Sequence, residues 1–350
     1  MSWSGPCGPC ADAARREHPG GSDLPVAIVA DVIPTVDLRQ PDAPDQIGRA
    51  CGSVGFFQII GHGVDRDVIE SAWSHARLFF DLPLEQRLEA ARRREGDAYG
   101  YLPMEVEALN RSLLDGYGAA DLKETFNVGP FRIPERPLTD EGEAWAFAPS
   151  PFPPALPTLR PAWEAYFEQM LDLAARLMRF FAVALDLPEE HFDQFIGESP
   201  SALRALNYPD LDGRTPPSGQ LRAGAHTDYG TLTILLQDDA PGGLEVLDPE
   251  TNHWIAVPHT PEAFVVNLGD LMARWTNDRW RSTLHRVVLP PIDAGRPSRR
   301  QSMAFFHNAD YHARIECLPT CVVAPRRPTY EPVLAGPHLM SKFHRATASG

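Results

Sequence analysis

The sequence predicts an α+β protein with a mainly β core, in which a helical N-terminal region precedes an antiparallel barrel or jelly roll. Three observations lead to this prediction. Helical periodicity is confined to the chain before about residue 200, short β-rich runs follow it, and turn residues rather than helices separate those runs. The 350 residues, of which 43% are hydrophobic, are sufficient for a substantial core.

The N-terminal region is expected to contain a strand and two helices. Order begins at residues 33–38, and the apolar run 54–60 is predicted to be a strand ended by glycines. Between residues 65 and 80 apolar side chains recur at helical spacing, and Asp65 is suited to cap that helix. A second, highly charged helix is expected over residues 84–96.

A proline-rich stretch and a long helix come next. Residues 129–161 contain nine prolines, which we interpret as an extended loop on one domain rather than as a linker between two. Pro161 then suits the first turn of a helix that runs to about residue 185. One face of this helix carries an apolar stripe, which is typical of core packing.

The β core is predicted from short runs rich in β-branched and aromatic residues. Asp, Pro and Gly punctuate them, as expected for tight turns. The runs cover residues 202–208, 231–237, 244–247, 254–257, 263–268, 284–289 and 301–307. We therefore expect a flexible tail over residues 1–24, with Cys7 and Cys10 in it, and a single unit over residues 25–350. That unit divides into an N-terminal region, 25–160, and a core, 200–310.

Charge and targeting signals exclude several classes of partner. The formal net charge of −15 disfavours nucleic acid and anionic membranes, because both need a basic face. Neither a signal peptide nor a membrane span is visible, so a soluble, cytoplasmic protein is expected, with a monomer as the default. Five cysteines, an odd number, do not suggest a disulfide scaffold.

Two His-x-Asp pairs are candidates for metal binding, because residues two apart on a strand point to the same side. His191 and Asp193 follow a helix end within a polar segment, which indicates a solvated surface. His226 and Asp228 precede the run 231–237 and so lie at the edge of the β core. Only the second pair is expected to bind a metal.

His285 is the candidate third ligand, on another strand. Two histidines and one carboxylate would occupy one face of an octahedral metal, which favours Fe(II) in an oxygenase, although a zinc hydrolase can use similar ligands. Arg300 and Ser302 come two apart on the following strand and would both point inward. An arginine in that position is suited to bind a carboxylate in a bidentate manner.

These motifs, together with others in the same order, resemble the isopenicillin N synthase-like branch of the Fe(II)- and 2-oxoglutarate-dependent dioxygenases. The resemblance extends from about residue 33 to about residue 318. Its motifs lie at residues 33–38, 55–64, 121–126, 206–209, 226–230, 267–270, 282–287 and 300–302.

The resemblance implies a fold, a set of cofactors and a reaction. The fold is a double-stranded β-helix, a jelly-roll variant. Fe(II) is implied to be held by His226, Asp228 and His285, and 2-oxoglutarate by Arg300 and Ser302. Tyr208 matches a family tyrosine of the pocket, and Asn207 is expected to assist it.

With O2, such an enzyme oxidises an unactivated C–H bond of a small organic substrate and releases succinate and CO2. The outcome is hydroxylation, or desaturation or cyclisation, and natural-product metabolism is one context for it. Residues 96–114 and the C-terminal end are expected to determine the substrate, with Tyr99 and Tyr101 among the residues that could reach the opening.

Three alternatives remain open at this stage. An isopenicillin N synthase-type oxidase uses O2 without 2-oxoglutarate and has its own Arg-x-Ser pair. A β-barrel without catalytic activity could bind a small molecule. A zinc hydrolase would need an acid or base beside the metal, and no His-Glu-x-x-His element is present.

Overall fold

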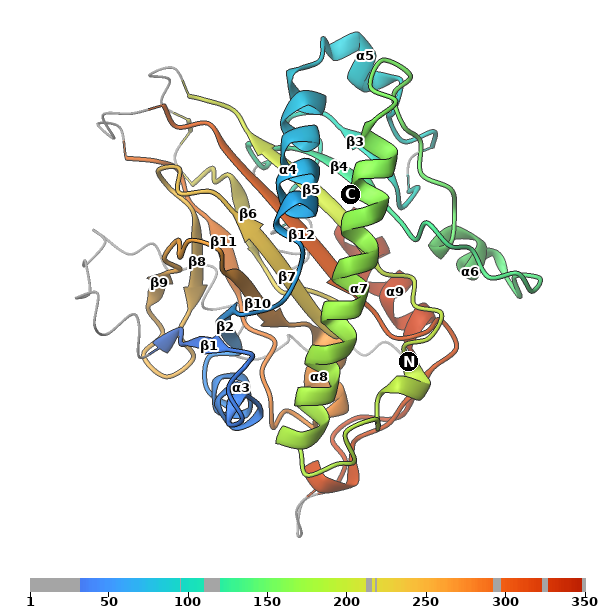
Figure 1. Cartoon of the computed structure of the whole chain (residues 1–350), viewed down its shortest axis with the longest axis vertical. Coiled ribbons are helices and arrows are strands. Elements are labelled where there is room, and N and C mark those ends of the chain that lie inside the picture. The colour runs from blue at the N-terminus through green and yellow to red at the C-terminus, as the bar shows by residue number, and fades with distance from the viewer. Residues whose placement is uncertain are drawn as a thin grey trace, which may run out of the picture.

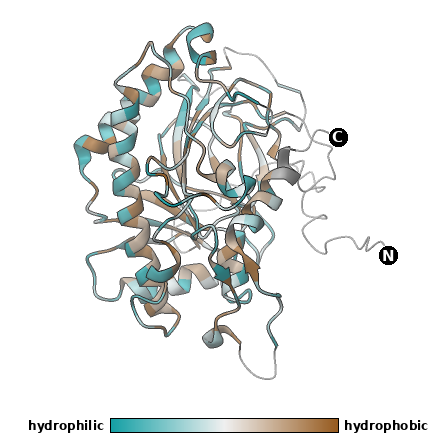
Figure 2. Ribbon diagram, turned by 90° about the vertical axis from the view of Figure 1, so that its right-hand side faces the viewer, coloured by the Kyte–Doolittle hydropathy of each residue, from teal (hydrophilic) through white to brown (hydrophobic). Residues whose placement is uncertain are grey.

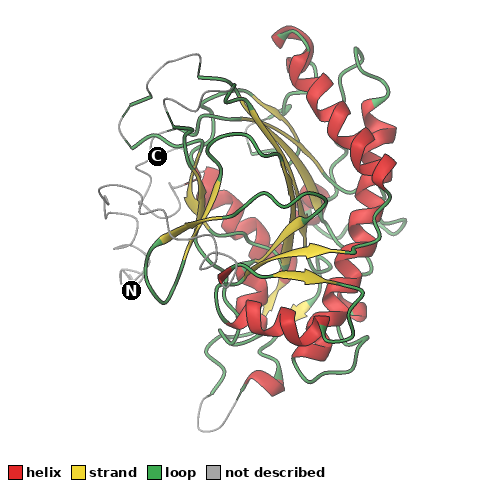
Figure 3. Cartoon of the chain, turned by 60° about the vertical axis from the view of Figure 1, so that its left-hand side comes forward, coloured by secondary structure: helices red, strands yellow, loops and turns green. Residues whose placement is uncertain are grey.

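Two β-sheets face each other across the centre of the molecule (Figure 3). The computed structural model describes residues 32–94, 96–109, 120–211, 216–217, 219–291, 297–322 and 327–347. In the large sheet the strand order is β1-β2-β10-β7-β12-β5-β4-β3, and in the small sheet it is β6-β11-β8-β9. Apart from the parallel pair β1–β2, neighbouring strands of both sheets are antiparallel.

The strands are short, as the runs in the sequence predict. Those of the large sheet are β1 (Thr35–Asp37), β2 (Phe56–Ile60), β3 (Gly100–Leu102), β4 (Glu124–Val128), β5 (Ala202–Tyr208), β7 (Leu232–Gln237), β10 (Phe264–Leu268) and β12 (Arg300–His307). Those of the small sheet are β6 (Ala223–His226), β8 (Leu244–Leu247), β9 (Trp254–Ala256) and β11 (His285–Val287). A separate two-stranded pair joins β13 (Arg314–Ile315) to β14 (Val333–Leu334).

Helices cover the outer face of the large sheet (Figures 1 and 3). On this face lie α4 (Arg66–Asp81) and α7 (Leu159–Ala184), with α3 (Ala43–Gly52) packed against α7. The other described α-helices, α5 (Leu84–Leu88), α6 (Glu141–Ala146), α8 (Asp270–Trp275) and α9 (Ala335–Thr347), lie elsewhere, with α6 against α9. Along α7 one stripe is buried, and Phe167 from it meets Phe305 of β12 with ring centres 5.1 Å apart. Figure 2 shows the matching alternation of hydrophobic and hydrophilic residues around the helices.

The inner faces of the two sheets pack on each other with a smaller set of side chains. Leu206 and Tyr208 of β5 and Ala304 of β12 lie against Ala223 of β6 and Val287 of β11. This thin apolar layer leaves room for a cavity between the sheets. The inward-facing residues of β5, β12, β6 and β11 therefore determine what that cavity can bind.

Most of the predicted elements are present, with one helix shorter than expected. Asp65 caps α4 by accepting a hydrogen bond from the backbone N–H of Asp67, as predicted. The charged helix expected over residues 84–96 ends as α5 at Leu88. It stops because the chain turns to pair with β3: the Ala90 carbonyl accepts from Tyr101 N–H at 2.7 Å, and Ala91 forms an isolated bridge to Tyr101.

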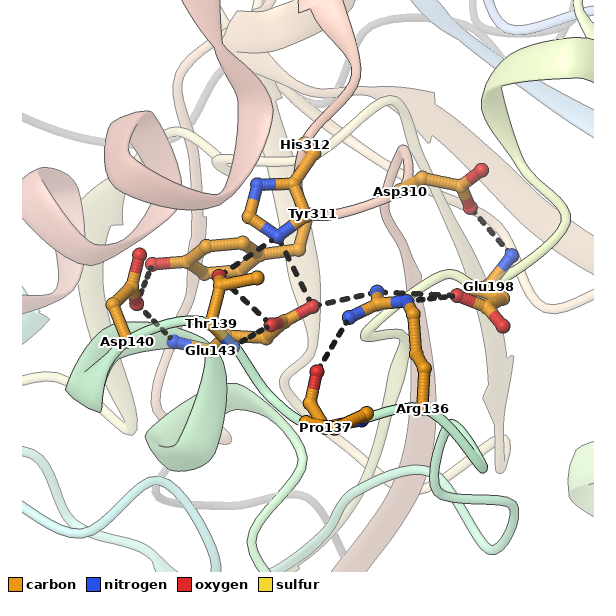
Figure 4. A network of polar contacts seen from close by, with 9 residues as sticks. All are labelled: Arg136, Pro137, Thr139, Asp140, Glu143, Glu198, Asp310, Tyr311 and His312. Carbon is orange, nitrogen blue, oxygen red and sulfur yellow. Dashed lines mark hydrogen bonds and ion pairs between the residues drawn. The ribbon is translucent and has the colours of Figure 1, made fainter.

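The proline-rich segment carries the short helix α6 and a polar network (Figure 4). Buried Glu143 accepts hydrogen bonds from Arg136 Nη2 at 2.7 Å and from the backbone N–H of Thr139 at 2.7 Å. His312 Nε2, in the segment after β12, lies 3.2 Å from the same carboxylate. The network connects this stretch to the segment after β12.

Two further expectations concern the N-terminal tail and membrane-spanning helices. The predicted tail, residues 1–24, and Cys7 and Cys10 lie outside the described residues. Among the helices that are described, none has the length and apolar character needed to cross a bilayer.

Candidate metal centre and adjoining cavities

Three predicted ligands converge where the small sheet meets the loop after β6. His226 ends β6, Asp228 follows two residues later, and His285 begins β11. Because β6 and β11 pair with His285 opposite His226, the two imidazole rings lie 4.3 Å apart, centre to centre. Asp228 Oδ1 lies 3.7 Å from His285 Nε2, and one ligand atom from each residue fits within 4.8 Å of the others.

Each histidine is oriented by its own backbone. His226 Nδ1 lies 2.7 Å from the Gly224 carbonyl oxygen, and His285 Nδ1 lies 3.0 Å from that of Thr283. A carbonyl can only accept, so each Nδ1 carries the proton and Nε2 keeps its lone pair for a metal. Burial, and after it the proximity of His285, lowers the pKa of His226, which keeps that ring neutral.

Asp228 is held by two donors that leave one oxygen free. Its Oδ2 accepts from Thr233 Oγ1 at 2.6 Å and from Asn267 Nδ2 at 2.7 Å, so Oδ1 faces the histidines. Burial alone would raise the pKa of Asp228, but the two histidines and these hydrogen bonds hold it below its ordinary value.

A close backbone approach makes this arrangement possible. A Cβ built on Gly269 would clash with the Gly230 carbonyl oxygen, so the end of β10 can press against the loop after Asp228 only because residue 269 is glycine. The approach is completed by a 2.8 Å hydrogen bond from Asp270 N–H to the Asp228 carbonyl.

The donor set fits a metal with open positions. Two imidazole nitrogens and one carboxylate oxygen, turned toward a common point, form the facial triad that non-haem Fe(II) oxygenases use. The other His-x-Asp pair has no such geometry, because Asp193 forms an ion pair with Arg179 at 2.8 Å and both residues are partly exposed. Among the described residues, His226 and Asp228 lie with His285 in a group that could hold a metal ion, and the surface pair does not.

An inner cavity lies between the sheets beside these ligands. It encloses about 560 Å³ and is lined by His226, Asp228, His285, Tyr208, Arg300 and Ser302, among others. Arg300 pairs with Tyr208 across β12 and β5, and Ser302 pairs with Leu206, so all three predicted residues of this site face the same side.

Arg300 is buried and incompletely satisfied. Its Nη2 donates to Gln237 Oε1 at 2.8 Å, whereas Nη1 is buried with no hydrogen-bond partner among the described residues. The carboxylate of Asp238 is 4.0 Å from Nε. A buried guanidinium nitrogen without an acceptor is costly, so a carboxylate in the inner cavity would stabilise it.

Asn207 does not reach this cavity. Adjacent residues of a strand point to opposite faces, so Asn207 points away from Tyr208. Its Nδ2 donates to Glu124 Oε1 at 2.7 Å, and its Oδ1 accepts from Arg299 Nε at 2.9 Å. Asn207 therefore lies on the opposite face of the sheet and is not among the described residues that line the inner cavity, contrary to the expectation that it assists Tyr208 there.

A larger outer cavity adjoins the inner one. It encloses about 930 Å³, part of it open to solvent, and its walls are mainly apolar. The two cavities share five lining residues, Leu109, Arg204, His226, Asp228 and Phe306. Two of the three candidate metal ligands therefore stand at the junction between the cavities.

The walls of the outer cavity come from segments far apart in the sequence. Tyr99 lines it, as anticipated, while Tyr101 is buried and hydrogen-bonded to Glu124. Trp145 of α6 and Leu339 and Phe343 of α9 complete the wall, and the Trp145 and Phe343 rings meet at 4.9 Å.

Sequence reasoning missed Arg204, Asn127 and Phe306, which also line the outer cavity. The two-residue period of β5 was an available signal, because Arg204 has the same parity as Tyr208. Asn127 lies on β4, a strand that was not predicted.

Comparison with known proteins places the chain in a family. Residues 200–309 match the model of the 2OG-Fe(II) oxygenase superfamily, and residues 33–153 match that of the non-haem dioxygenase in morphine synthesis N-terminal region. The 2-oxoglutarate-dependent dioxygenase caaD of Aspergillus niger is 37% identical over 73% of this chain and 79% of that protein. The validamycin A dioxygenase of Streptomyces hygroscopicus subsp. limoneus is 35% identical over 81% of this chain and 78% of that protein.

Solved structures show the same fold. A full-length Neurospora crassa protein, solved in complex with alpha-KG, superposes with a TM-score of 0.76 at 29% identity, covering 89% of this chain and 95% of that one. A 2OG-Fe(II) oxygenase family protein from Caulobacter crescentus gives 0.75 at 28%, covering 89% and 98%. The chain belongs to the Fe(II)- and 2-oxoglutarate-dependent oxygenases, and it is an oxidoreductase that uses Fe(II), 2-oxoglutarate and O2.

Proposed function

We propose that His226, Asp228 and His285 hold the Fe(II) of this oxygenase. The proposal is supported by the orientation of the three side chains, since both Nε2 atoms and Asp228 Oδ1 are left without a hydrogen-bond donor among the described residues. Bound there, the iron supplies O2 activation coupled to oxidative decarboxylation of 2-oxoglutarate to succinate and CO2. The protein contributes the fixed ligand geometry and a site that excludes bulk water.

In the inner cavity, Arg300, Ser302 and Tyr208 bind the distal carboxylate of 2-oxoglutarate. The observation that carries this assignment is the buried, unpartnered Nη1 of Arg300. A carboxylate would satisfy that nitrogen through a charge-assisted hydrogen bond, and the Ser302 hydroxyl would donate a second. Because His226, Asp228 and His285 line the same cavity, they would be within reach of the keto-acid end of the bound co-substrate.

The substrate occupies the outer cavity, with the C–H bond to be oxidised held at the junction of the two cavities. Because His226 and Asp228 line both cavities, a group in either one reaches the same metal centre. The reaction is hydroxylation of a small organic molecule, with desaturation or cyclisation as other outcomes of the same oxidation. One relative is named as a validamycin A dioxygenase, and the similar Neurospora crassa protein was solved in complex with thymine. Both compounds are small molecules, which supports this substrate size.

An isopenicillin N synthase-type oxidase also has an Arg-x-Ser pair but needs no 2-oxoglutarate, whereas this chain belongs to the 2-oxoglutarate-dependent oxygenases. Release of labelled CO2 from 1-¹⁴C-2-oxoglutarate separates the two, because an oxidase would consume O2 without releasing CO2 from that compound. Turnover in the absence of a primary substrate is sufficient for a first measurement.

The second His-x-Asp pair supplies a matched control for the metal site. In Asp228→Ala we expect CO2 release to fall by roughly 100-fold or more, since even the hydrogen-bond partners of metal ligands are worth about 10- to 100-fold. Asp193→Ala removes the same group from the surface pair and should retain wild-type turnover. Equal activity of the Asp228→Ala and wild-type proteins would contradict the proposed iron site.

A further inference from the structure

A cluster of buried and partly buried charged side chains lies beside the outer cavity. Lys123 and Arg204 form ion pairs with two carboxylates, Glu107 and Asp121, and a third cation, Arg92, lies close to Arg204 and Glu107. Lys123 is fully buried between Asp121 and Glu107, so it already uses both carboxylates. In a chain with a net charge of −15, this described cluster carries a local excess of positive charge.

Arg204 is the member of the cluster that faces the cavities. It is the only cationic residue among the described lining of either the outer cavity or the junction, and it lies against Phe306 with Cζ 5.7 Å from the ring centre. Its tie to Glu107 is long, 3.3 and 3.4 Å, and uses Nη1 alone. Among the described residues no acceptor is within hydrogen-bond distance of its Nε or Nη2, so one edge of the guanidinium is available to a ligand.

Glu107 is shared by two cations, Arg204 and Lys123, and Lys123 is also paired with Asp121. Burial alone would raise the pKa of Glu107, but Arg204 and Lys123 hold it below its ordinary value, so it stays ionised. One negative charge is thus shared between Lys123 at 3.1 Å and Arg204 at 3.3 Å.

In the described part of the chain, Arg92 adds an unpaired cation behind the cavity wall. Its Cζ lies 5.6 Å from the ring centre of Phe343, which lines the outer cavity, and its Nε and Nη2 are buried without a hydrogen-bond partner. Among the described residues Arg92 forms no ion pair. Burial, and after it the proximity of Arg204, lowers the pKa of Arg92 to about 10, which leaves it charged near neutral pH.

Asn127 stands next to Arg204 and offers a second polar contact. The two residues are direct cross-strand partners on β4 and β5, and both line the outer cavity. Asn127 is 4% exposed, and its Oδ1 has no hydrogen-bond partner in the described part of the chain. A buried amide left in this state is stabilised when a ligand supplies the missing partner.

We infer that the outer cavity takes a small organic carboxylate as its primary substrate, with the carboxylate bound by the free edge of Arg204 and a neighbouring polar group bound by the Asn127 amide. This inference rests on the proposed function and adds the chemical class of the substrate. The field of Arg92 supports the bound anion from behind Phe343, and the apolar walls hold the remaining carbon skeleton. Arg204 also places the acid close to the junction, where the metal centre lies.

The test uses a panel of matched pairs, each a small aromatic or aliphatic carboxylic acid and its primary amide. For every compound, stimulation of 2-oxoglutarate decarboxylation is measured together with binding by calorimetry to the Mn(II)- and 2-oxoglutarate-loaded enzyme. We expect acids to bind and stimulate and their amides to be at least tenfold weaker. Charge-assisted hydrogen bonds of this kind are worth about tenfold or more in affinity.

Variants assign the preference to Arg204. In Arg204→Gln the Kd for the acids should rise at least tenfold, with a smaller change in the KM for 2-oxoglutarate, and Arg204→Lys should be intermediate because it keeps the charge but loses the planar fork. Arg179→Gln, which removes a surface arginine on α7, is the matched control and should behave as wild type. Thermal melting confirms that each variant is folded.

The possible outcomes separate this inference from the proposed function. Amides that bind as well as acids, an Arg204→Gln enzyme that keeps its acid affinity, or a panel without any binding acid would overturn the carboxylate inference while decarboxylation persists. A larger loss in the KM for 2-oxoglutarate than in the Kd for the acids would assign Arg204 to the co-substrate and also overturn it. Absence of any decarboxylation by the wild-type enzyme would instead count against the proposed function.

Discussion

The guanidinium carbon of Arg222 lies 5.8 Å from the ring centre of Tyr208, a residue that lines the inner cavity. Arg222 is buried, and it donates to the carbonyl oxygens of Pro241, at 2.8 Å, and of Ser298. It thereby connects two segments that flank Arg300 and fixes the ring against which the proposed co-substrate site is built.

We expect Arg222→Met to weaken 2-oxoglutarate binding without removing any residue that touches it. The KM for 2-oxoglutarate should rise about tenfold, while kcat at saturating co-substrate changes less, because the arginine positions Tyr208 and the flanking loops. The two freed carbonyls should also lower the free energy of unfolding by about 2–3 kcal/mol. Steady-state kinetics and urea denaturation measure the two effects, and an unchanged KM in a destabilised variant would reduce Arg222 to a purely structural role.

The hydrogen bonds to Asp228 predict a graded loss of metal affinity. Thr233→Val removes one of the two donors to Oδ2 at nearly constant volume and should weaken Fe(II) or Mn(II) binding by about 10- to 100-fold. Thr233→Ser keeps the hydroxyl and serves as the control. Metal titration followed by calorimetry gives the affinities directly, and identical values for the Val and Ser variants would show that Asn267 alone orients the carboxylate.

Arg300 and Ser302 should contribute unequally to co-substrate binding. Arg300→Lys keeps the charge but loses the forked donor geometry, so we expect the KM for 2-oxoglutarate to rise more than about tenfold. Ser302→Ala removes one neutral donor and should raise it about two- to tenfold. The kinetic measurement is the same in both cases, and a larger effect of the serine would contradict the proposed pairing of Arg300 with the distal carboxylate.

Acid sensitivity should depend on Glu143. The Arg136 guanidinium, in spite of burial, lowers the pKa of Glu143 from 4.5 to about 2. A pKa that is lower in the folded state means that the folded protein binds fewer protons than the unfolded chain. The stabilisation is therefore complete above the unfolded value and is lost as the pH falls from about 4.5 toward 2.

The measurement is denaturant unfolding between pH 3 and pH 7. Glu143→Gln should be less stable than wild type at pH 7 by about 1–3 kcal/mol, and its stability should fall less steeply below about pH 5. Glu141→Gln, on an exposed neighbour, is the matched control. If the two variants have the same pH profile, the network in Figure 4 does not contribute to acid sensitivity.

The sequence predicts those elements of the fold that depend on local patterns, and not those that depend on contacts between residues far apart in the chain. β5 and β8 were predicted with their observed bounds, because alternation and turn residues are local signals. The strands β4 and β6 were missed. In β4, Glu124 is buried and is paired with Arg87 and Asn207, which come from distant parts of the chain. Such long-range partners leave no local pattern.

The candidate metal ligands could be proposed from the sequence because their spacing and order are distinctive, whereas the walls of the cavities could not. Asn207 was expected in the pocket from its place beside Tyr208 in a motif, although strand parity places it on the opposite face. Arg204 was overlooked although its parity matches that of Tyr208. The contribution of α9 requires a contact between Phe343 and Trp145, which are far apart in the sequence, and a single sequence does not reveal such a contact.

The outer cavity is walled in part by α9, a helix close to the C-terminus, and by α6, within the proline-rich stretch. Neither helix carries a residue of the proposed iron site or of the proposed co-substrate site. Random mutagenesis restricted to residues 337–343 and 144–147 should therefore change the substrate selectivity of the enzyme and leave its decarboxylation of 2-oxoglutarate intact. Substrate selectivity can therefore change through substitutions in α6 and α9 alone, both in evolution and in protein engineering.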